Sequence, residues 1–259
     1  MPGAIVRKLT PEQEELGRKR EELAAVRAAL AERELELADL RAHLKSFEGL
    51  YLRQVGVLYA ELDDWEAKVA ELEASLRPSA SAKQNAQEAR KRAEETHEAT
   101  HGEASKAKDF KPSPDLRNLF RDVAKRIHPD FAKDDADRER RTRLMAQAND
   151  AYSRGDAETL QQILDDYDES SESVQGEGVG AELIRIIRQI HQAKKNISSI
   201  EKELANLRAS EIAKLRDDTE MARRAGRDLL NELAASIRKE IADLRGKHSS
   251  LVRQVRANE

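Results

Sequence analysis

Apolar residues recur every seven positions along the first third of the chain. A second apolar position follows three residues after several of them, at Val26, Leu40 and Phe47, and most of the intervening residues are polar or charged. Sustained heptads of this kind are typical of a coiled coil, in which the apolar positions form a seam between helices. We therefore expect an N-terminal coiled coil over residues 10–76. Its seven-residue series is Leu16, Leu23, Leu30, Leu37, Leu44, Tyr51, Leu58, Trp65 and Leu72.

The seam changes its spacing near the middle of this segment. Phe47, Tyr51 and Val55 follow one another at intervals of four residues, a stutter that locally unwinds a supercoil. Several of the chain's few aromatic residues also gather between Phe47 and Trp65. The coil is therefore either a dimerisation or spacer element, or an arm that binds a client or target protein through its aromatic stretch.

The middle of the chain, residues 113–167, predicts two helices joined by a short loop. The first has one apolar face at helical spacing, and the second places apolar residues on its inner side. A third, shorter helix follows before residue 167. The apolar positions of the two longer helices are Leu116, Leu119, Phe120, Val123, Ile127, Leu144, Met145, Ala148 and Tyr152.

Local signals mark several helix ends. Thr10 and Gln13 have the spacing of a capping box around a first-turn proline. Ser113 followed by Pro114 is typical of a helix start, and Gly155 is typical of a helix end. These signals place boundaries on the first coil and on the central helices.

Two polar segments separate the central module from the terminal coils. Residues 77–112 lack a convincing apolar stripe and predict a polar linker or an exposed helix. Residues 168–180 are acidic, rich in Gly and Ser and without periodicity, which is typical of a linker.

Heptads return over residues 181–257, where we expect a C-terminal coiled coil folded as a helical hairpin. Its turn is expected near Ala209-Ser210, where the serine can cap a new helix, or near Gly226. The two terminal coils have similar lengths. They can pack on one another within one chain, or each can pair with a second copy in a homodimer.

The composition fits an all-α fold. Charged residues make up 37% of the 259 residues and aromatic residues only 3%, which indicates long, solvent-exposed helices. The net charge is −4 with both signs interspersed, which argues against a nucleic-acid-binding surface along the whole chain. There is no cysteine, and no apolar run reaches the roughly 20 residues that a membrane helix needs. The first residues are too poor in apolar side chains for a secretory signal, so we expect a cytoplasmic protein.

No pattern in the sequence predicts catalysis. The histidines outside the central loop are scattered without metal-ligand spacing, and no glycine-rich phosphate loop is found. We therefore expect a protein that is not an enzyme and that uses neither a cofactor nor a metal ion.

The loop of the central module carries the tripeptide His128-Pro129-Asp130, here called the HPD loop. Taken alone, it has a plain structural explanation. Histidine is favourable at a helix C-terminus, proline ends helices, and aspartate is common in turns.

The helix before the loop adds a second feature. At about 100° per residue, Arg117, Arg121 and Lys125 form one row along this helix, and His128 falls on the same row. These three cationic residues are here called the basic row. The structural explanation of the tripeptide does not account for its occurrence beside the basic row.

The combination resembles the J-domain of DnaJ-type co-chaperones over residues 116–167. In that family a basic helix leads into an HPD loop, and the returning helix ends in a motif like Ala148-Asn149-Asp150-Ala151-Tyr152 of this chain. The resemblance implies a module that binds a DnaK-type ATPase chaperone and stimulates its ATP hydrolysis, while the coiled coils hold an unspecified client or oligomerise. The implied partner-binding residues are His128, Pro129, Asp130, Arg117, Arg121, Lys125 and Arg126.

Two features depart from the family. Phe131 stands where a lysine commonly follows the HPD loop, and no short tyrosine-bearing helix precedes the basic helix. Either residues 84–110 substitute for that helix or the module is minimal. The alternative function is a structural or scaffolding coiled-coil protein with a degenerate J-domain that serves only for docking. A third hypothesis is a nucleic-acid- or filament-associated protein of the long-coil type.

Overall fold

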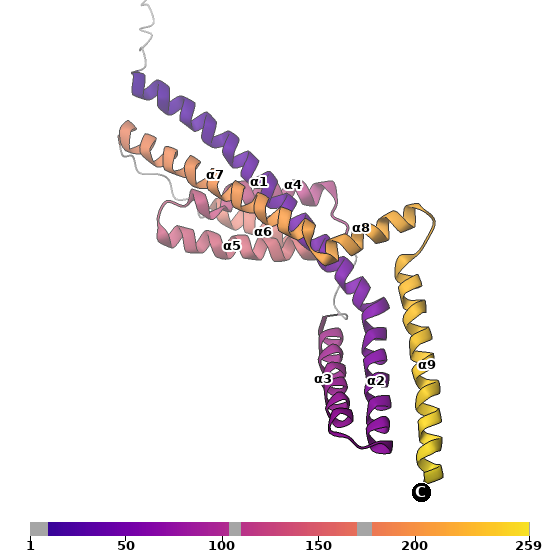
Figure 1. Ribbon diagram of the computed structural model, residues 1–259. Coiled ribbons are helices and arrows are strands. Elements are labelled where there is room, and N and C mark those ends of the chain that lie inside the picture. The colour runs from indigo at the N-terminus through magenta and orange to yellow at the C-terminus, as the bar shows by residue number, and fades with distance from the viewer. Residues whose placement is uncertain (1–9, 104–109, 170–177, 259) are drawn as a thin grey trace, which may run out of the picture. The chain divides into compact units, whose positions relative to one another are not determined.

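The computed structural model describes residues 10–103, 110–169 and 178–258, and their regular structure is entirely helical (Figure 1). This confirms the all-α fold class. The chain divides into two units. The first comprises Met1–Ala42 and Phe110–Ala209, and the second comprises His43–Asp109 and Ser210–Glu259. Helix α1 (Pro11–Tyr51) contributes to both, so the expected N-terminal coil is shared between them.

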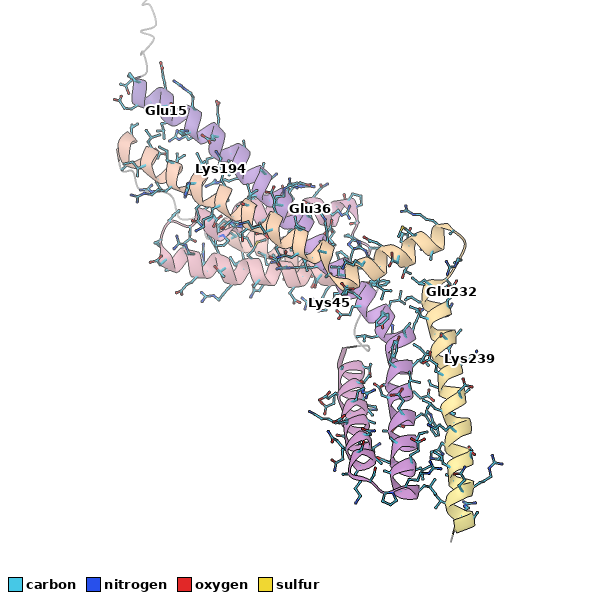
Figure 2. The ribbon with its side chains drawn as sticks, viewed as in Figure 1. Glu15, Glu36, Lys45, Lys194, Glu232 and Lys239 are labelled. Atoms are coloured by element: carbon cyan, nitrogen blue, oxygen red, sulfur yellow. The ribbon has the colours of Figure 1, made fainter. Side chains whose placement is uncertain are left out.

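The first unit contains two long helices that pack side by side within one chain. Helix α1 packs along α7 (Val179–Ala209) through a continuous apolar seam. Ion pairs flank the seam, with Arg20 on Glu182 at 2.7 Å and Arg208 on Glu36 at 2.5 Å, and Figure 2 shows charged side chains along both helices. Later residues of α1 meet later residues of α7, so the two helices run parallel. The buried seam positions are Leu16, Leu23, Val26, Leu30, Leu37, Ile186, Ile190, Ala193, Ile200 and Leu204.

The rest of the first unit is a compact group of three helices and a turn. The rings of Phe120 and Tyr152 meet at a tilt of 46° with their centroids 4.6 Å apart, and the backbone carbonyl of Arg126 accepts a hydrogen bond from Arg141. These contacts join the start of one helix to the end of the next, so the first two helices are antiparallel. The elements are α4 (Pro114–Ile127), the 3-10 turn η2 (Pro129–Phe131), α5 (Asp135–Arg154) and α6 (Ala157–Glu169).

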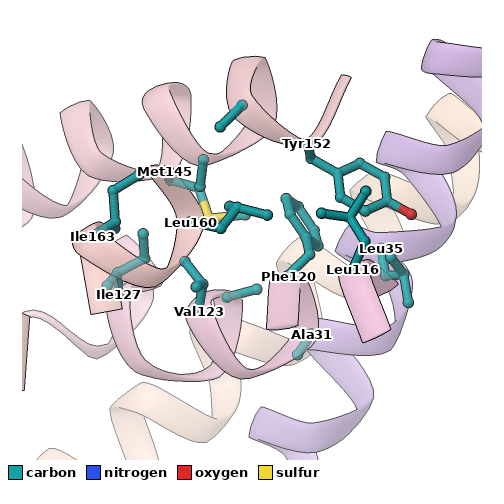
Figure 3. Close-up of a cluster of buried hydrophobic side chains, with 13 residues drawn as sticks. Ala31, Leu35, Leu116, Phe120, Val123, Ile127, Met145, Tyr152, Leu160 and Ile163 are labelled. Carbon is teal, nitrogen blue, oxygen red and sulfur yellow. The ribbon is translucent and has the colours of Figure 1, made fainter. Parts of the chain in front are cut away.

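Helix α1 completes the core of these three helices. Ala31 and Leu35 of α1 are buried in the same cluster as Phe120 and Tyr152 (Figure 3). The hydroxyl of Tyr152 also donates a hydrogen bond to Asp39 of α1. Helix α3 (Ala80–Glu103), which lies in the segment before the hairpin in sequence, belongs to the second unit. The apolar face of α1 covers the hairpin instead.

Inside the second unit, the helix geometry changes where the seam spacing changes. A π-helical turn, η1 (Leu52–Gly56), separates α1 from α2 (Val57–Leu76), and Val55 in this turn is fully buried. The local unwinding expected from the stutter thus takes the form of a π-turn. A Cβ on Gly56 would lie 3.0 Å from Leu52 and 3.4 Å from Thr100 of α3, so the close approach of these helices depends on glycine.

Helix α3 packs antiparallel to α2 on small residues. Ala67 of α2 lies against Ala89 and Ala93 of α3, and Arg92 pairs with Glu66 at 3.2 Å. Alanine buries too little area to stand out in an apolar pattern, which is why the sequence left open whether this segment is a linker or an exposed helix.

The C-terminal part breaks at both expected turn sites. Ser210 caps α8 (Glu211–Arg224) by accepting a hydrogen bond from the amide of Ala213, and Gly226 adopts a positive φ of 75° before α9 (Leu229–Asn258). Helix α9 packs along α2, where Trp65 meets His248 edge to face at 5.4 Å.

Candidate functional site

The HPD loop is built by the end of α4. Pro129 has no amide hydrogen and disfavours helix at the residue before it, so α4 ends at Ile127 and His128 leaves the helix with a ψ of 132°. The Nδ1 atom of His128 then accepts a hydrogen bond from the amide of Asp130 at 3.2 Å. The carbonyl of His128 accepts another from the amide of Phe131 at 3.1 Å. These bonds give the loop one defined conformation.

The side chain of His128 points into the protein. It is 5% exposed, and its Nε2 lies 3.2 Å from the Oε1 atom of Glu34 on α1. Because Nδ1 accepts a bond from a backbone amide, the neutral ring carries its proton on Nε2 and donates it to Glu34. Both ring nitrogens are therefore engaged within the chain.

Asp130 is held by α7, the helix that packs along α1. Its side chain is 7% exposed, and the Nδ2 atom of Asn196 on α7 donates to both carboxylate oxygens at 2.7 and 2.8 Å. Burial raises the pKa of Asp130, while His128 and the Asn196 amide act in the opposite direction. Because its side chain is largely shielded from solvent, a carboxylate in this position depends on the hydrogen-bond donors of Asn196 on α7.

Two members of the basic row face acidic residues of α1. Arg117 pairs with Asp39 at 3.2 Å, and the Nε atom of Arg121 donates to Glu32 at 2.6 Å. Lys125 instead pairs with Asp122 of its own helix at 3.7 Å. Of the expected site residues, the structure brings Arg117, Arg121, His128 and Asp130 against α1 or α7.

The remaining expected site residues are more accessible. Pro129 and Lys125 are half-buried, and Arg126 is exposed in the last turn of α4. Pro129 also lines a groove of about 890 Å³ between the loop and α7, together with Arg138, Arg185 and Arg188.

Phe131 connects the loop to the apolar seam between α1 and α7. Its side chain is 4% exposed and belongs to the apolar seam of α1 and α7, and the guanidinium of Arg27 lies 4.4 Å from the ring centre. The residue that departs from the J-domain pattern is thus an apolar anchor. A lysine here would place a charge in the seam.

Arg141 of α5 supports the loop through hydrogen bonds to its backbone, and the sequence pattern did not predict this role. It is 6% exposed, and it donates to Asp137 at 2.9 Å and to the carbonyls of Arg126 and His128 at 2.8 and 3.3 Å. These carbonyls belong to the last turn of α4, where a helix leaves its acceptors unpaired. Extending the inner stripe of α5 one turn back from Met145 reaches Arg141, and that signal was available.

Glu34 and Asn196 were also missed, and here no local signal exists. Each lies among many polar residues in a heptad pattern, and only the packing of distant segments brings them to the loop.

Within residues 10–103, 110–169 and 178–258, no group of three or more His, Cys, Asp or Glu side chains is arranged to hold a metal ion. No helix in the same ranges combines the length and apolar character needed to span a bilayer.

Comparison of the chain with family models, curated proteins and solved structures finds no match in any of the three.

Proposed function

We propose that this protein is a co-chaperone of the J-domain type, which recruits a DnaK-type ATPase chaperone through the HPD loop and stimulates its ATP hydrolysis. The observation that carries the proposal is the setting of the tripeptide. It occupies a rigid turn between two antiparallel helices, and the basic row lies on the helix that precedes it. The coiled coils would then provide the body that holds a client.

The physical argument separates two roles. A loop fixed by packed helices presents few residues in one geometry, which suits a contact that carries most of the binding energy. Cationic side chains beside it attract an acidic partner and set the association rate. Arg141 and the core around Phe120 and Tyr152 provide the rigidity that the first role requires.

The test is a steady-state ATPase assay with the DnaK-type chaperone of the same organism. We expect the full chain to accelerate ATP turnover, and His128→Gln to abolish the acceleration while circular dichroism shows unchanged helicity. His191→Gln is the matched control, because His191 is an exposed histidine of α7. Equal acceleration by wild type and His128→Gln would contradict the proposal.

One observation favours a second candidate, a scaffolding protein in which the HPD loop is an internal joint. The side chains of His128 and Asp130 are both buried and bonded to the coiled coil. This candidate predicts no stimulation by any variant of the chain, and His128→Gln would then loosen only the attachment of α4 and α5 to α1.

A further inference from the structure

Four of the seven residues that the proposed function assigns to the chaperone contact are bound by α1 or α7 of the chain itself, namely Arg117, Arg121, His128 and Asp130. We propose that α1 and α7 act as an intramolecular substitute for the chaperone and hold the HPD loop in an autoinhibited state. This inference rests on the proposed function and adds a regulation to it. The side chains of Glu34 and Asn196, which hold His128 and Asp130, are here called the clamp.

Helix α1 offers the chemistry expected of an acidic partner. It presents three carboxylates to the hairpin, and each meets one donor of the surface that the J-domain resemblance implies. The pairs are Asp39 with Arg117, Glu32 with Arg121, and Glu34 with His128. A second protein with an acidic surface would compete for these same groups, because each cation and the histidine can be fully paired by only one partner at a time.

The apolar contacts of α1 lie between these carboxylates. Ala31 and Leu35 are four residues apart on one face of α1 and enter the core beside Phe120. Glu32 and Glu34 flank this face. Helix α1 therefore covers the hairpin as a docked helix does, with an apolar centre and a charged rim.

Helix α7 supplies the part of the clamp that is specific for the loop. Asn196 gives the buried carboxylate of Asp130 two donor hydrogens, and Phe131 inserts into the seam between α7 and α1. When the loop leaves α7, Asp130 loses both donors and becomes available to a donor of another protein. Asp130 is therefore both the side chain that the chaperone would bind and the side chain that holds the closed state.

The equilibrium between the closed state, in which α1 and α7 hold the loop, and the open state is expected to shift when single contacts are removed. Each of the two arginine pairs has an exposed member, since Arg117 in the pair with Asp39 is 43% exposed and Glu32 in the pair with Arg121 is 57% exposed. Solvent therefore screens both pairs, and they contribute little to the stability of the closed state. The buried contacts of His128, Asp130 and Phe131 provide most of the restraint. If the open state is populated at about one part in ten or less, the apparent affinity for the chaperone falls by the same factor.

The experiment compares the full chain with a clamp variant that combines Glu34→Ala and Asn196→Ala. The matched control combines Glu22→Ala and Lys194→Ala, which removes an ion pair between the same two helices without touching the loop. Hydrogen exchange of residues 128–133, followed by mass spectrometry without chaperone, reports release of the loop. The concentration that gives half-maximal ATPase stimulation reports access of the chaperone.

We expect faster exchange in the clamp variant alone, together with a fall of about tenfold or more in the half-maximal concentration. His128→Gln added to the clamp variant should abolish stimulation. Unchanged exchange would overturn the inference, because the clamp would then not hold the loop. Faster exchange with the half-maximal concentration of wild type would also overturn it and would leave the proposed function standing. Faster exchange without stimulation by either protein would remove the proposed function, and the inference with it.

Discussion

Replacing Arg141 with methionine should detach the HPD loop from α5 and destabilise the first unit. The guanidinium of Arg141 is buried and donates to Asp137 and to two carbonyls at the end of α4. Methionine keeps much of the side-chain volume and removes every donor. The carboxylate of Asp137, which is 14% exposed, then loses its nearest cation, and the carbonyl of Arg126 loses its donor.

The size of the effect follows from these contacts. Removing one member of a buried ion pair costs about 3 to 5 kcal/mol, because the other charge stays buried. The hydrogen bonds to the two carbonyls are part of that cost, since bonds made by a charged donor contribute about 1.5 to 3 kcal/mol each. Arg138→Met is the matched control on the same helix. Arg138 is 62% exposed and pairs with Asp135 three residues away, so its loss should cost about 0.5 kcal/mol or less.

The assay must report on the first unit. The single tryptophan, Trp65, belongs to the second unit, so its fluorescence would follow the other unit. Hydrogen exchange of peptides from α4 and α5 measures the local opening free energy directly. A loss of 3 kcal/mol corresponds to exchange that is about a hundredfold faster. Equal exchange in the Arg141→Met and Arg138→Met proteins would refute the assignment of Arg141 as the support of the loop.

The remaining predictions concern two glycine positions and a titrating group. Gly155→Ala should lower the free energy of unfolding by about 1 kcal/mol in thermal melts, because Gly155 ends α5 with a φ of 72°. Gly17→Ala, in the interior of α1 with no atom near the added carbon, should instead raise it by up to about 1 kcal/mol, and a loss in both variants would contradict this. Burial raises the pKa of Asp130 above its ordinary 3.8, so its contribution to the free energy of unfolding is complete below pH 3.8 and is lost as pH rises through the folded-state pKa. Urea titrations at a series of pH values should show the free energy of unfolding of wild type falling relative to that of Asp130→Asn between pH 3.8 and the folded-state pKa of Asp130. A difference between the two proteins that does not change with pH would count against the raised pKa.

Local sequence signals determined the helices and their ends. Thr10 and Gln13 form the reciprocal capping bonds that their spacing indicated, and Ser113 accepts the amide of Leu116 as an N-cap does. Gly155 adopts the left-handed conformation that ends α5. The apolar positions of α4 and α5 form the core in which Tyr152 is fully buried. Such features depend on residues within one or two turns, so a pattern in the sequence contains all the information that they need.

Only the tertiary structure decided which surfaces meet. A heptad pattern requires that a seam be buried, but many partners and both directions satisfy it, so the parallel pairing of α1 with α7 was not fixed by the sequence. The contact of His128 with Glu34 spans 94 residues, and that of Asp130 with Asn196 spans 66. Before folding, Glu34 is one of many equivalent acidic residues, and the packing of the hairpin on α1 singles it out. The sequence therefore determined that the chain has an HPD loop beside a basic row, and the packing of α1 and α7 decided that the side chains of His128 and Asp130 are buried.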